Sequence, residues 1–337
     1  MLLSCFFPTT VVCVDDKEDF LDRIEGEINF LNVTVKKFTD PYKALAYVND
    51  VNRQNRLDCF DLAREGEEST SDWKSILLNI NCLHREIYSF DRFSRISVVI
   101  TDHSMPGMSG VEFSAGIADS GIQRVLLTGI ADEKVAINAF NEGHISRFVK
   151  KLGENFADEV RDNISKSLIA YFKKHTEDLS KNLSVYGKTP LSDPIFASFF
   201  RNVCRHQDYV EYYMLDTFGG YLFLDTFGKP SFLCVLTEHE MENVISLAEE
   251  SKEARPDVIA ALKSKEYILA SHSRSSQLPP IATWENYLRP ARKLDGYQTY
   301  YFASVDSALL DLDCDNIKSF DMFRKRIARE ISDSKVC

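Results

Sequence analysis

Four charged side chains in the amino-terminal half of this 337-residue chain could act together. They stand just past the ends of short apolar runs that predict buried strands: Asp15, Asp16, Asp102 and Lys150. Ligands of a doubly wound sheet bind outside the carboxyl ends of its strands, so these charges would meet in one pocket. Three carboxylates at such range need a counter-ion, and their oxygens suit a hard divalent cation. The sequence therefore predicts a Mg²⁺ site with a lysine beside it.

The elements that must position these charges alternate between strand and helix patterns. Short β-branched runs predict five strands, at Thr10–Val14, Val33–Phe38, Ser97–Thr101, Arg124–Thr128 and Arg147–Val149. Helical patterns lie between them, at Lys17–Asn29, Tyr42–Val51, Gly110–Asp119 and Asp132–Asn141. Such alternation is typical of a parallel sheet with crossover helices. The fold class predicted for this half is therefore α/β, with a doubly wound, five-stranded parallel sheet.

Two stretches depart from this alternation. The connection at about 53–96 is far longer than the about two to six residues usual in α/β loops. Apolar residues at three- and four-residue steps from Leu77 to Phe90 predict an inserted helix within it. A long helical pattern then covers 154–184. It is either a stalk or pairing surface, or an ordinary last helix that packs on its own sheet.

Residues 185–337 have a different pattern. Close-set apolar runs and predicted helices follow one another, with strands at Tyr209–Leu215, Tyr221–Leu224 and Ser231–Leu236, and helices at Glu238–Ser251, Pro256–Lys263 and about Asn316–Ser332. The string LDTFG stands at 215–219 and again at 224–228, between the strands. Asp and Gly favour tight hairpin turns. We therefore expect an α+β domain with an antiparallel sheet.

Composition excludes several classes of protein. With 44% hydrophobic and 27% charged residues, the chain is typical of globular proteins and long enough for two domains. The net charge of -11 disfavours a chain-wide surface for nucleic acid or anionic membrane. No apolar run approaches the roughly 18 residues that span a bilayer, and Met1–Phe7 lacks the basic region of a signal peptide. We expect a cytoplasmic protein whose scattered cysteines are reduced.

Four strings resemble the receiver domains of two-component response regulators. They are VVCVDD at 11–16, VVITDHSMPGMSGVEF at 98–113, VLLTG at 125–129 and NEGHISRFVKK at 141–151. The resemblance implies a flavodoxin-like, CheY-like domain. The expected divisions are a receiver at 1–153 with an insertion at about 53–96, a helix or linker at 154–184, and an output domain at 185–337.

The resemblance also implies roles for individual residues. Asp102 is the expected phosphoacceptor, Thr128 the switch hydroxyl, and Lys150 the partner of the phosphoryl oxygens. The expected Mg²⁺ ligands are Asp15, Asp16, Asp102 and the backbone carbonyl of Ser104. A sensor histidine kinase or a phosphotransfer protein is the expected phosphodonor, and a homodimer linked to phosphorylation is expected.

Some positions depart from the family pattern when Lys150 is aligned with its lysine. The Pro that usually follows this lysine is replaced by Lys151. Arg147 stands where many receivers carry a Tyr or Phe that changes rotamer on phosphorylation. An aromatic switch is therefore not expected here, and Phe148 is expected to be a core residue. Ile130 places an apolar side chain beside the expected path of the hydrolytic water, so the phosphoryl group is predicted to be long-lived.

The output half carries weaker signals. We find no convincing helix-turn-helix, Gly-rich phosphate loop or paired metal-ligand motif in it, so it is not expected to be a turnover enzyme. Its one basic cluster is either the solvated face of a helix or a contact for nucleic acid or an acidic partner: Arg324, Lys325, Arg326 and Arg329. The half resembles an uncharacterised output module of response regulators, including a quorum-sensing regulator.

The sequence thus favours a response regulator of a phosphorelay, whose output changes conformation or dimerisation and acts by binding, with quorum-sensing control as an expected setting. Two alternatives stay open for the output. It could bind DNA or RNA through the last helix, or it could bind a nucleotide or another ligand.

Overall fold

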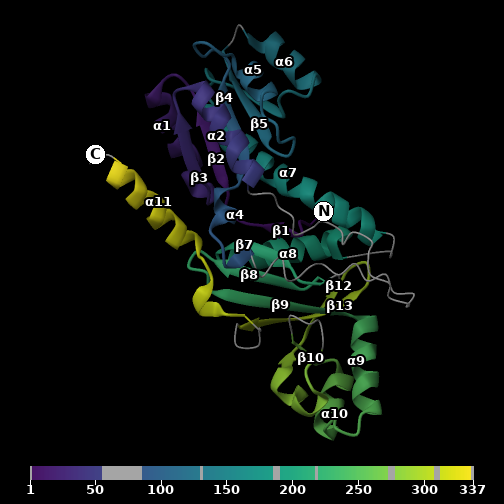
Figure 1. The fold of residues 1–337 in the computed structure, drawn as a ribbon. Coiled ribbons are helices and arrows are strands. Elements are labelled where there is room, and N and C mark those ends of the chain that lie inside the picture. The colour runs from purple at the N-terminus through teal and green to yellow at the C-terminus, as the bar shows by residue number, and fades with distance from the viewer. Residues whose placement is uncertain are drawn as a thin grey trace, which may run out of the picture. The chain divides into compact units, whose positions relative to one another are not determined.

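The computed structural model describes residues 2–54, 86–129, 132–184, 190–216, 219–271, 278–306 and 312–334. The chain forms two compact units (Figure 1). We call Phe7–Leu57 together with Phe90–His175 the parallel unit. The antiparallel unit consists of Met1–Phe6, Asp58–Ser89 and Thr176–Cys337.

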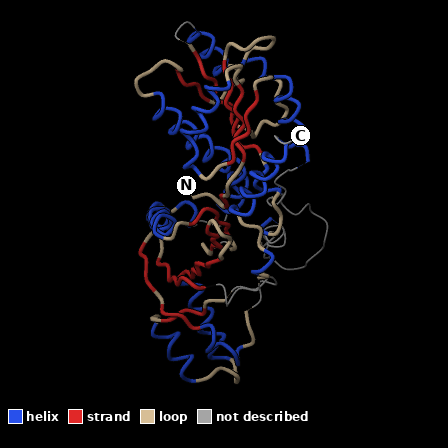
Figure 2. Tube along the Cα trace, turned by 90° about the vertical axis from the view of Figure 1, so that its left-hand side faces the viewer, coloured by secondary structure: helices blue, strands red, loops and turns tan. Residues whose placement is uncertain are grey.

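The parallel unit contains a five-stranded parallel sheet in the order β3-β2-β4-β5-β6. Its strands are β2 (Thr10–Val14), β3 (Thr34–Phe38), β4 (Ile96–Asp102), β5 (Gln123–Thr128) and β6 (Arg147–Lys150). Its helices are α1 (Glu18–Ile28), α2 (Pro41–Gln54), α4 (Asp91–Ser94), α5 (Gly110–Ala115), α6 (Glu133–Asn141) and α7 (Phe156–Ser184), with a 3-10 turn at Asn29–Leu31. The predicted doubly wound fold is confirmed, and Figure 2 shows helices on both sides of these strands.

Alternation of side chains along the central strands explains why helices cover both faces of this sheet. Val12 and Val14 of β2 share a buried cluster with Val48 of α2 and Phe113 of α5. The intervening Cys13 points the other way and is also fully buried. Because strands buried on both faces are mostly apolar, consecutive apolar residues stand at 11–14 in β2 and at 98–100 in β4.

The antiparallel unit contains a six-stranded sheet in the order β1-β7-β8-β9-β13-β12. Its strands are β1 (Cys5–Phe6), β7 (Tyr209–Met214), β8 (Tyr221–Asp225), β9 (Pro230–Thr237), β12 (Arg292–Asp295) and β13 (Thr299–Asp306). The pair β10 (Tyr267–Leu269) and β11 (Leu288–Pro290) forms a second, two-stranded sheet. The helices are α8 (Pro194–His206), α9 (Glu238–Glu250), α10 (Pro256–Ser264) and α11 (Phe320–Ser334), with 3-10 turns at Pro190–Ser192, Ile281–Tyr287 and Cys314–Asn316. The predicted α+β fold with an antiparallel sheet is thereby confirmed.

Aromatic side chains fill the space between α8 and the six-stranded sheet. Phe196 and Phe200 of α8 are fully buried against Tyr221, Phe223 and Tyr300. The ring of Phe200 lies 4.4 Å from that of Tyr221 and 5.4 Å from that of Phe223. Such ring pairs add to the burial of apolar area, so α8 and the sheet form one core.

The LDTFG turn behaves as predicted where it is described. Asp225 accepts a hydrogen bond from the backbone N–H of Phe227 at 2.8 Å, and Gly228 has a φ of 81°. The first copy of the string includes positions 217 and 218, which lie outside the described residues. Most of the predicted insertion, from 55 to 85, also lies outside them.

The two units differ from the predicted domain division at two places. Strand β1 belongs to the antiparallel unit, where Cys5 pairs with Tyr213 of β7. The end of the predicted insertion also belongs there, because the carbonyl of Ile87 accepts a hydrogen bond from the N–H of Lys318 at 2.9 Å. Helix α7 covers the predicted 154–184 region, and its residues are divided between the units after His175.

Within the described part of the chain, no helix combines the length and the apolar character that a bilayer crossing requires.

Candidate functional site

Three carboxylates meet at the carboxyl ends of β2 and β4. Asp15 is fully buried, Asp102 is 7% exposed, and Asp16 is exposed beside them. One oxygen from each carboxyl group lies within 4.8 Å of the others. The parallel register of β2 and β4 explains this convergence, because Val14 pairs with Thr101 and the next residue of each strand is an Asp.

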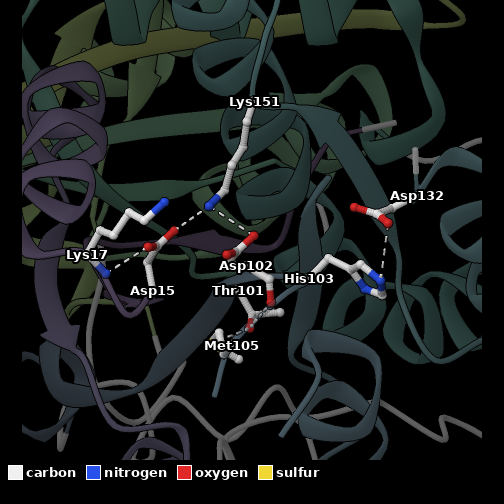
Figure 3. A network of polar contacts seen from close by, with 8 residues as sticks. All are labelled: Asp15, Lys17, Thr101, Asp102, His103, Met105, Asp132 and Lys151. Carbon is white, nitrogen blue, oxygen red and sulfur yellow. Dashed lines mark hydrogen bonds and ion pairs between the residues drawn. The ribbon is translucent and has the colours of Figure 1, made fainter. Parts of the chain in front are cut away.

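Local structure positions the two buried aspartates, and for Asp15 it includes a backbone hydrogen bond (Figure 3). The N–H of Lys17 donates to Oδ1 of Asp15 at 2.9 Å. On the Asp102 side, a Cβ on Gly110 would lie 2.2 Å from the Asp102 carbonyl oxygen. Only glycine therefore allows α5 to begin so close to the end of β4. Ser109 caps this helix through a reciprocal pair of hydrogen bonds with Glu112.

Lys151, not Lys150, is the lysine of this pocket. Nζ of Lys151 lies 2.6 Å from Oδ2 of Asp15 and 2.9 Å from Oδ1 of Asp102 (Figure 3). Nζ of Lys150 instead lies 3.2 Å from Oε1 of Glu133 at the start of α6. The assignment of Lys150 is corrected for a geometric reason. Successive side chains of a strand point to opposite sides, so a shift of one residue redirects the lysine.

This correction also moves the family alignment by one residue. The residue three positions before the pocket lysine becomes Phe148 rather than Arg147. Phe148 is half-buried and packs against the cluster formed by Leu126, Ala136, Ala139 and Ile145. The residue after the pocket lysine becomes Leu152, which is 72% exposed. No peptide bond among the described residues is cis, so both flanks of Lys151 are trans.

Three other predicted positions lie near the pocket or outside the described chain. Thr128 ends β5 and is buried, and its hydroxyl has no hydrogen-bond partner among the described residues. Ser104 is exposed in the loop between Asp102 and α5, and its carbonyl remains a predicted ligand. Ile130 lies outside the described residues, so the long lifetime expected for the phosphoryl group remains a prediction.

The electrostatics of Asp15 favour a bound cation. Burial raises the pKa of the Asp15 carboxyl, and the nearby Asp102 charge raises it further. The hydrogen bonds from Lys151 and from the Lys17 N–H lower this pKa but do not fully offset burial. A divalent cation would supply the missing positive charge, and three clustered carboxylate oxygens are the donor set that Mg²⁺ accepts. The residues present therefore fit the predicted ion.

Two aromatic or imidazole side chains near the pocket were not singled out from the sequence. The ring of Phe20 in α1 lies 4.4 Å from Nζ of Lys151. Nε2 of His103 lies 3.8 Å from Oδ1 of Asp132 across the loops that follow β4 and β5 (Figure 3). The sequence did contain a signal for Phe20. It stands four residues after Asp16, which is about one turn of the helix predicted there, so its side chain could be expected near the Asp pair.

The basic cluster of α11 does not form a convergent site. Nζ of Lys325 lies 2.7 Å from Asp321, and Nε of Arg326 lies 2.9 Å from Glu330, each one turn away on the same helix. The guanidinium of Arg324 lies 5.9 Å from the Phe320 ring. These in-helix contacts are typical of a solvated helix face. The other role predicted for these residues and Arg329, a contact with nucleic acid or an acidic partner, remains a prediction.

Comparison with known proteins identifies the family. No family model matches the chain, and no curated protein matches it. Among solved structures, the response regulator LqsR of Legionella pneumophila is 34% identical and superposes with a TM-score of 0.77. The match covers 96% of this chain and 95% of LqsR. This chain belongs to the response regulator family.

Two further matches concern only part of this response regulator. An uncharacterised protein from Neptuniibacter caesariensis is 24% identical over 49% of this chain and 91% of its own length, with a TM-score of 0.35. A response regulator receiver domain protein from Clostridium thermocellum is 18% identical over 50% of this chain and 97% of its own length, with a TM-score of 0.32. The family assignment rests on LqsR, whose similarity extends through both units. A signalling role follows from that assignment.

Proposed function

We propose that this response regulator accepts a phosphoryl group on Asp102 from a sensor histidine kinase or a phosphotransfer protein. The observation that carries the proposal is the position of Lys151, whose ammonium contacts both Asp15 and Asp102. A lysine beside two buried carboxylates at the end of a parallel strand is the arrangement that phosphoryl transfer to an aspartate requires. It supplies positive charge where the phosphoryl oxygens would arrive.

The chemistry assigned to each residue follows from this arrangement. Mg²⁺, held by Asp15, Asp16, Asp102 and the Ser104 carbonyl, would neutralise negative charge on the phosphoryl oxygens. A carboxylate oxygen of Asp102 bonds to phosphorus while the phosphorus–nitrogen bond to the donor histidine breaks, and the released imidazole keeps the electron pair. Lys151 transfers its contact from Asp15 to a phosphoryl oxygen. The Thr128 hydroxyl, buried at the end of β5, donates to another phosphoryl oxygen.

The antiparallel unit is proposed to act by binding rather than by catalysis. Phosphorylation at Asp102 changes the conformation or the homodimerisation of this unit, in the cytoplasm and in quorum-sensing control. Support comes from the similarity to a whole response regulator rather than to an isolated receiver domain. Nucleic-acid binding through α11 is not favoured, because Lys325 and Arg326 already pair with acidic residues of the same helix.

Intact-mass measurement tests the phosphoacceptor directly. We expect the wild-type protein to gain one phosphoryl group from acetyl phosphate in the presence of Mg²⁺ and to gain none after Mg²⁺ is removed by chelation. Asp102→Asn is the matched control, because the amide keeps the size of the side chain and loses the nucleophilic oxygen. Equal phosphate uptake by wild type and Asp102→Asn would overturn the assignment of Asp102.

A further inference from the structure

The ammonium of Lys151 has a third neighbour besides the two carboxylates. Nζ lies 4.4 Å from the centre of the ring of Phe20, which is the third residue of α1. The side chain of Lys151 is only 18% exposed, so the ring takes the place of much of the water that an ammonium group normally keeps. A cation at this distance over an aromatic face is attracted by the ring quadrupole.

We propose that Phe20 is a positioning residue that holds the Lys151 ammonium over the acidic pocket while the ammonium moves from Asp15 to the phosphoryl group. This inference rests on the proposed phosphorylation of Asp102. Phe20 does not touch the reacting atoms, and it acts through Lys151.

An aromatic ring suits this role better than a polar side chain would. A hydrogen-bond acceptor fixes one direction of the donor, whereas the ring attracts a cation anywhere over its face. Lys151 must release Asp15 when the oxygens of Asp15 turn to Mg²⁺, yet it must stay close to Asp102. The ring permits this exchange of partners because it does not compete for a particular N–H of the ammonium. It also carries no charge that could neutralise Lys151.

The ring of Phe20 has a second neighbour, in α7. Phe156, the first residue of α7, is buried, and its ring lies 5.6 Å from that of Phe20. The guanidinium of Arg23 lies 4.6 Å from the centre of the Phe156 ring. A series of contacts thus runs from the ammonium of Lys151 to the Phe20 ring, from that ring to Phe156, and from Phe156 to the guanidinium of Arg23. Loss of the Phe20 ring would leave Lys151 without its only described aromatic neighbour.

The test is a double-mutant cycle on the initial rate of phosphorylation by acetyl phosphate at saturating Mg²⁺. Phe20→Leu keeps an apolar side chain and removes the ring, and Phe20→Tyr restores an aromatic face. We expect Phe20→Leu to slow phosphorylation about fivefold, the factor expected for one cation–π contact, and Phe20→Tyr to recover most of the rate. In the Lys151→Ala background, Phe20→Leu should have no further effect, because its partner is gone.

Phe30, in the 3-10 turn that follows α1, offers a matched control. Its ring lies 6.0 Å from the guanidinium of Arg161 and it does not contact Lys151. Phe30→Leu therefore removes a ring and a cation–π contact of the same kind, and it should leave the phosphorylation rate unchanged. An equal slowing by Phe30→Leu, or an equal slowing by Phe20→Leu in the Lys151→Ala background, would overturn the proposal.

A second measurement does not depend on phosphorylation. The ring current of Phe20 should shift the ε-methylene protons of Lys151 upfield in the NMR spectrum of the unmodified protein. Phe20→Leu should abolish this shift and Phe20→Tyr should keep it. If wild type takes no phosphate but the shift is present, the proposed function fails while the contact between Phe20 and Lys151 stands. A Lys151 signal unaffected by Phe20→Leu would overturn the contact, and with it the positioning role.

Discussion

Nζ of Lys151 lies 2.6 Å from Oδ2 of Asp15, a carboxyl group that is fully buried at the end of a central strand. The same oxygens of Asp15 are the predicted ligands of Mg²⁺. Lys151 therefore neutralises part of the negative charge of Asp15 that Mg²⁺ would otherwise neutralise. The ammonium and the ion compete for the same carboxylate. The ammonium also contacts Asp102 at 2.9 Å. This contact can keep the ammonium in the pocket when Asp15 binds the ion instead.

The first prediction separates the two adjacent lysines. Lys151→Ala should slow phosphorylation by acetyl phosphate about 100-fold, the cost usual for removing one charged or hydrogen-bonding group aimed at developing charge. Lys150→Ala should change the rate by less than about twofold, because Lys150 pairs with Glu133 away from the carboxylates. Rates from intact-mass time courses at several Mg²⁺ concentrations measure both effects. A larger loss in Lys150→Ala than in Lys151→Ala would reverse the assignment.

The second prediction concerns the dependence of stability on pH. Because burial raises the pKa of Asp15 above its ordinary value of 3.8, the folded state holds this proton to a higher pH than the unfolded state does. Unfolding then releases a proton within that window, so this stabilising contribution is present at low pH and is lost as the pH rises through the raised pKa. Asp15→Asn lacks the ionisable group. Without Mg²⁺, its Tm at neutral pH should exceed that of wild type.

Thermal unfolding with and without Mg²⁺ checks this prediction. The advantage of Asp15→Asn should shrink as the pH falls below 3.8, where the wild-type carboxyl becomes protonated in both the folded and the unfolded state. Added Mg²⁺ should raise the Tm of wild type more than that of the variant, because a ligand stabilises the state that binds it. A lower Tm for Asp15→Asn at neutral pH, with no dependence on Mg²⁺, would contradict the account of this carboxyl.

The parallel unit could be predicted well from the sequence, because the patterns that indicate its strands and its acidic residues each lie within a short segment. The central strands β2 and β4 are mostly apolar, and acidic residues stand at their carboxyl ends, where Asp15 follows Val14 and Asp102 ends β4. The choice between Lys150 and Lys151 could not be made in this way. Both residues are lysines, and the side toward which each points depends on the residue at which β6 ends. Only the three-dimensional register decides that point.

The division between the units was harder to predict, for a different physical reason. Met1–Phe7 is recognisable in the sequence as an apolar segment, but the sequence could not show which strand it pairs with. Its partner, β7, begins at Tyr209 and is supplied by the other half of the chain. Pairing between such distant segments leaves no periodic signal in either of them. Contact between Phe20 and Lys151 went unpredicted for the same reason.

The third prediction tests the role of the amino-terminal strand in the antiparallel unit. Leu2 and Leu3 are 4% and 7% exposed, the Ser4 carbonyl accepts from the Met214 N–H at 2.7 Å, and the Leu3 carbonyl accepts from the Tyr221 hydroxyl at 2.9 Å. Deletion of residues 2–6 should therefore destabilise this unit by about 4 kcal/mol, mainly through the loss of two buried leucine side chains.

Fluorescence of Trp284 reports this unit, because Trp284 is buried within it. The chain has two Trp residues, so Trp73→Phe leaves Trp284 as the single emitter. Urea titration in that background should show a lower midpoint after the deletion, while phosphorylation in the parallel unit continues. An unchanged midpoint would show that β1 contributes nothing to the stability of the antiparallel unit.

The fourth prediction concerns Asp193, a fully buried carboxylate at the start of α8. It accepts hydrogen bonds from the N–H groups of Ile195, Phe196 and Tyr297 and from the Tyr300 hydroxyl. Asp193→Ala should cost about 3 kcal/mol, because it removes a helix cap and leaves buried donors unpaired. Urea titration of Trp284 fluorescence measures this loss. A midpoint equal to that of wild type would contradict it.

Asp193→Asn extends this prediction to pH. Although burial opposes the charged form of Asp193, the bonds from Tyr297, Phe196, Ile195 and Tyr300 hold the pKa of this carboxyl below its ordinary value of 3.8. The charge therefore stabilises the folded state above that value, and the contribution is lost as the pH falls through the lowered pKa. Asp193→Asn should be less stable than wild type at neutral pH, and the difference should shrink in acid. A difference that stays constant with pH would assign the effect to shape rather than charge.

Phosphorylation of Asp102 is proposed to change the state of this response regulator. Light scattering coupled to size exclusion, with intact-mass measurement of the same fractions, tests it most directly on wild type and Asp102→Asn. With acetyl phosphate and Mg²⁺, wild type should gain one phosphoryl group and change its hydrodynamic size or its oligomeric mass, whereas Asp102→Asn should do neither. A wild-type protein that takes no phosphate, or one that takes it without any change of state, would contradict the claim.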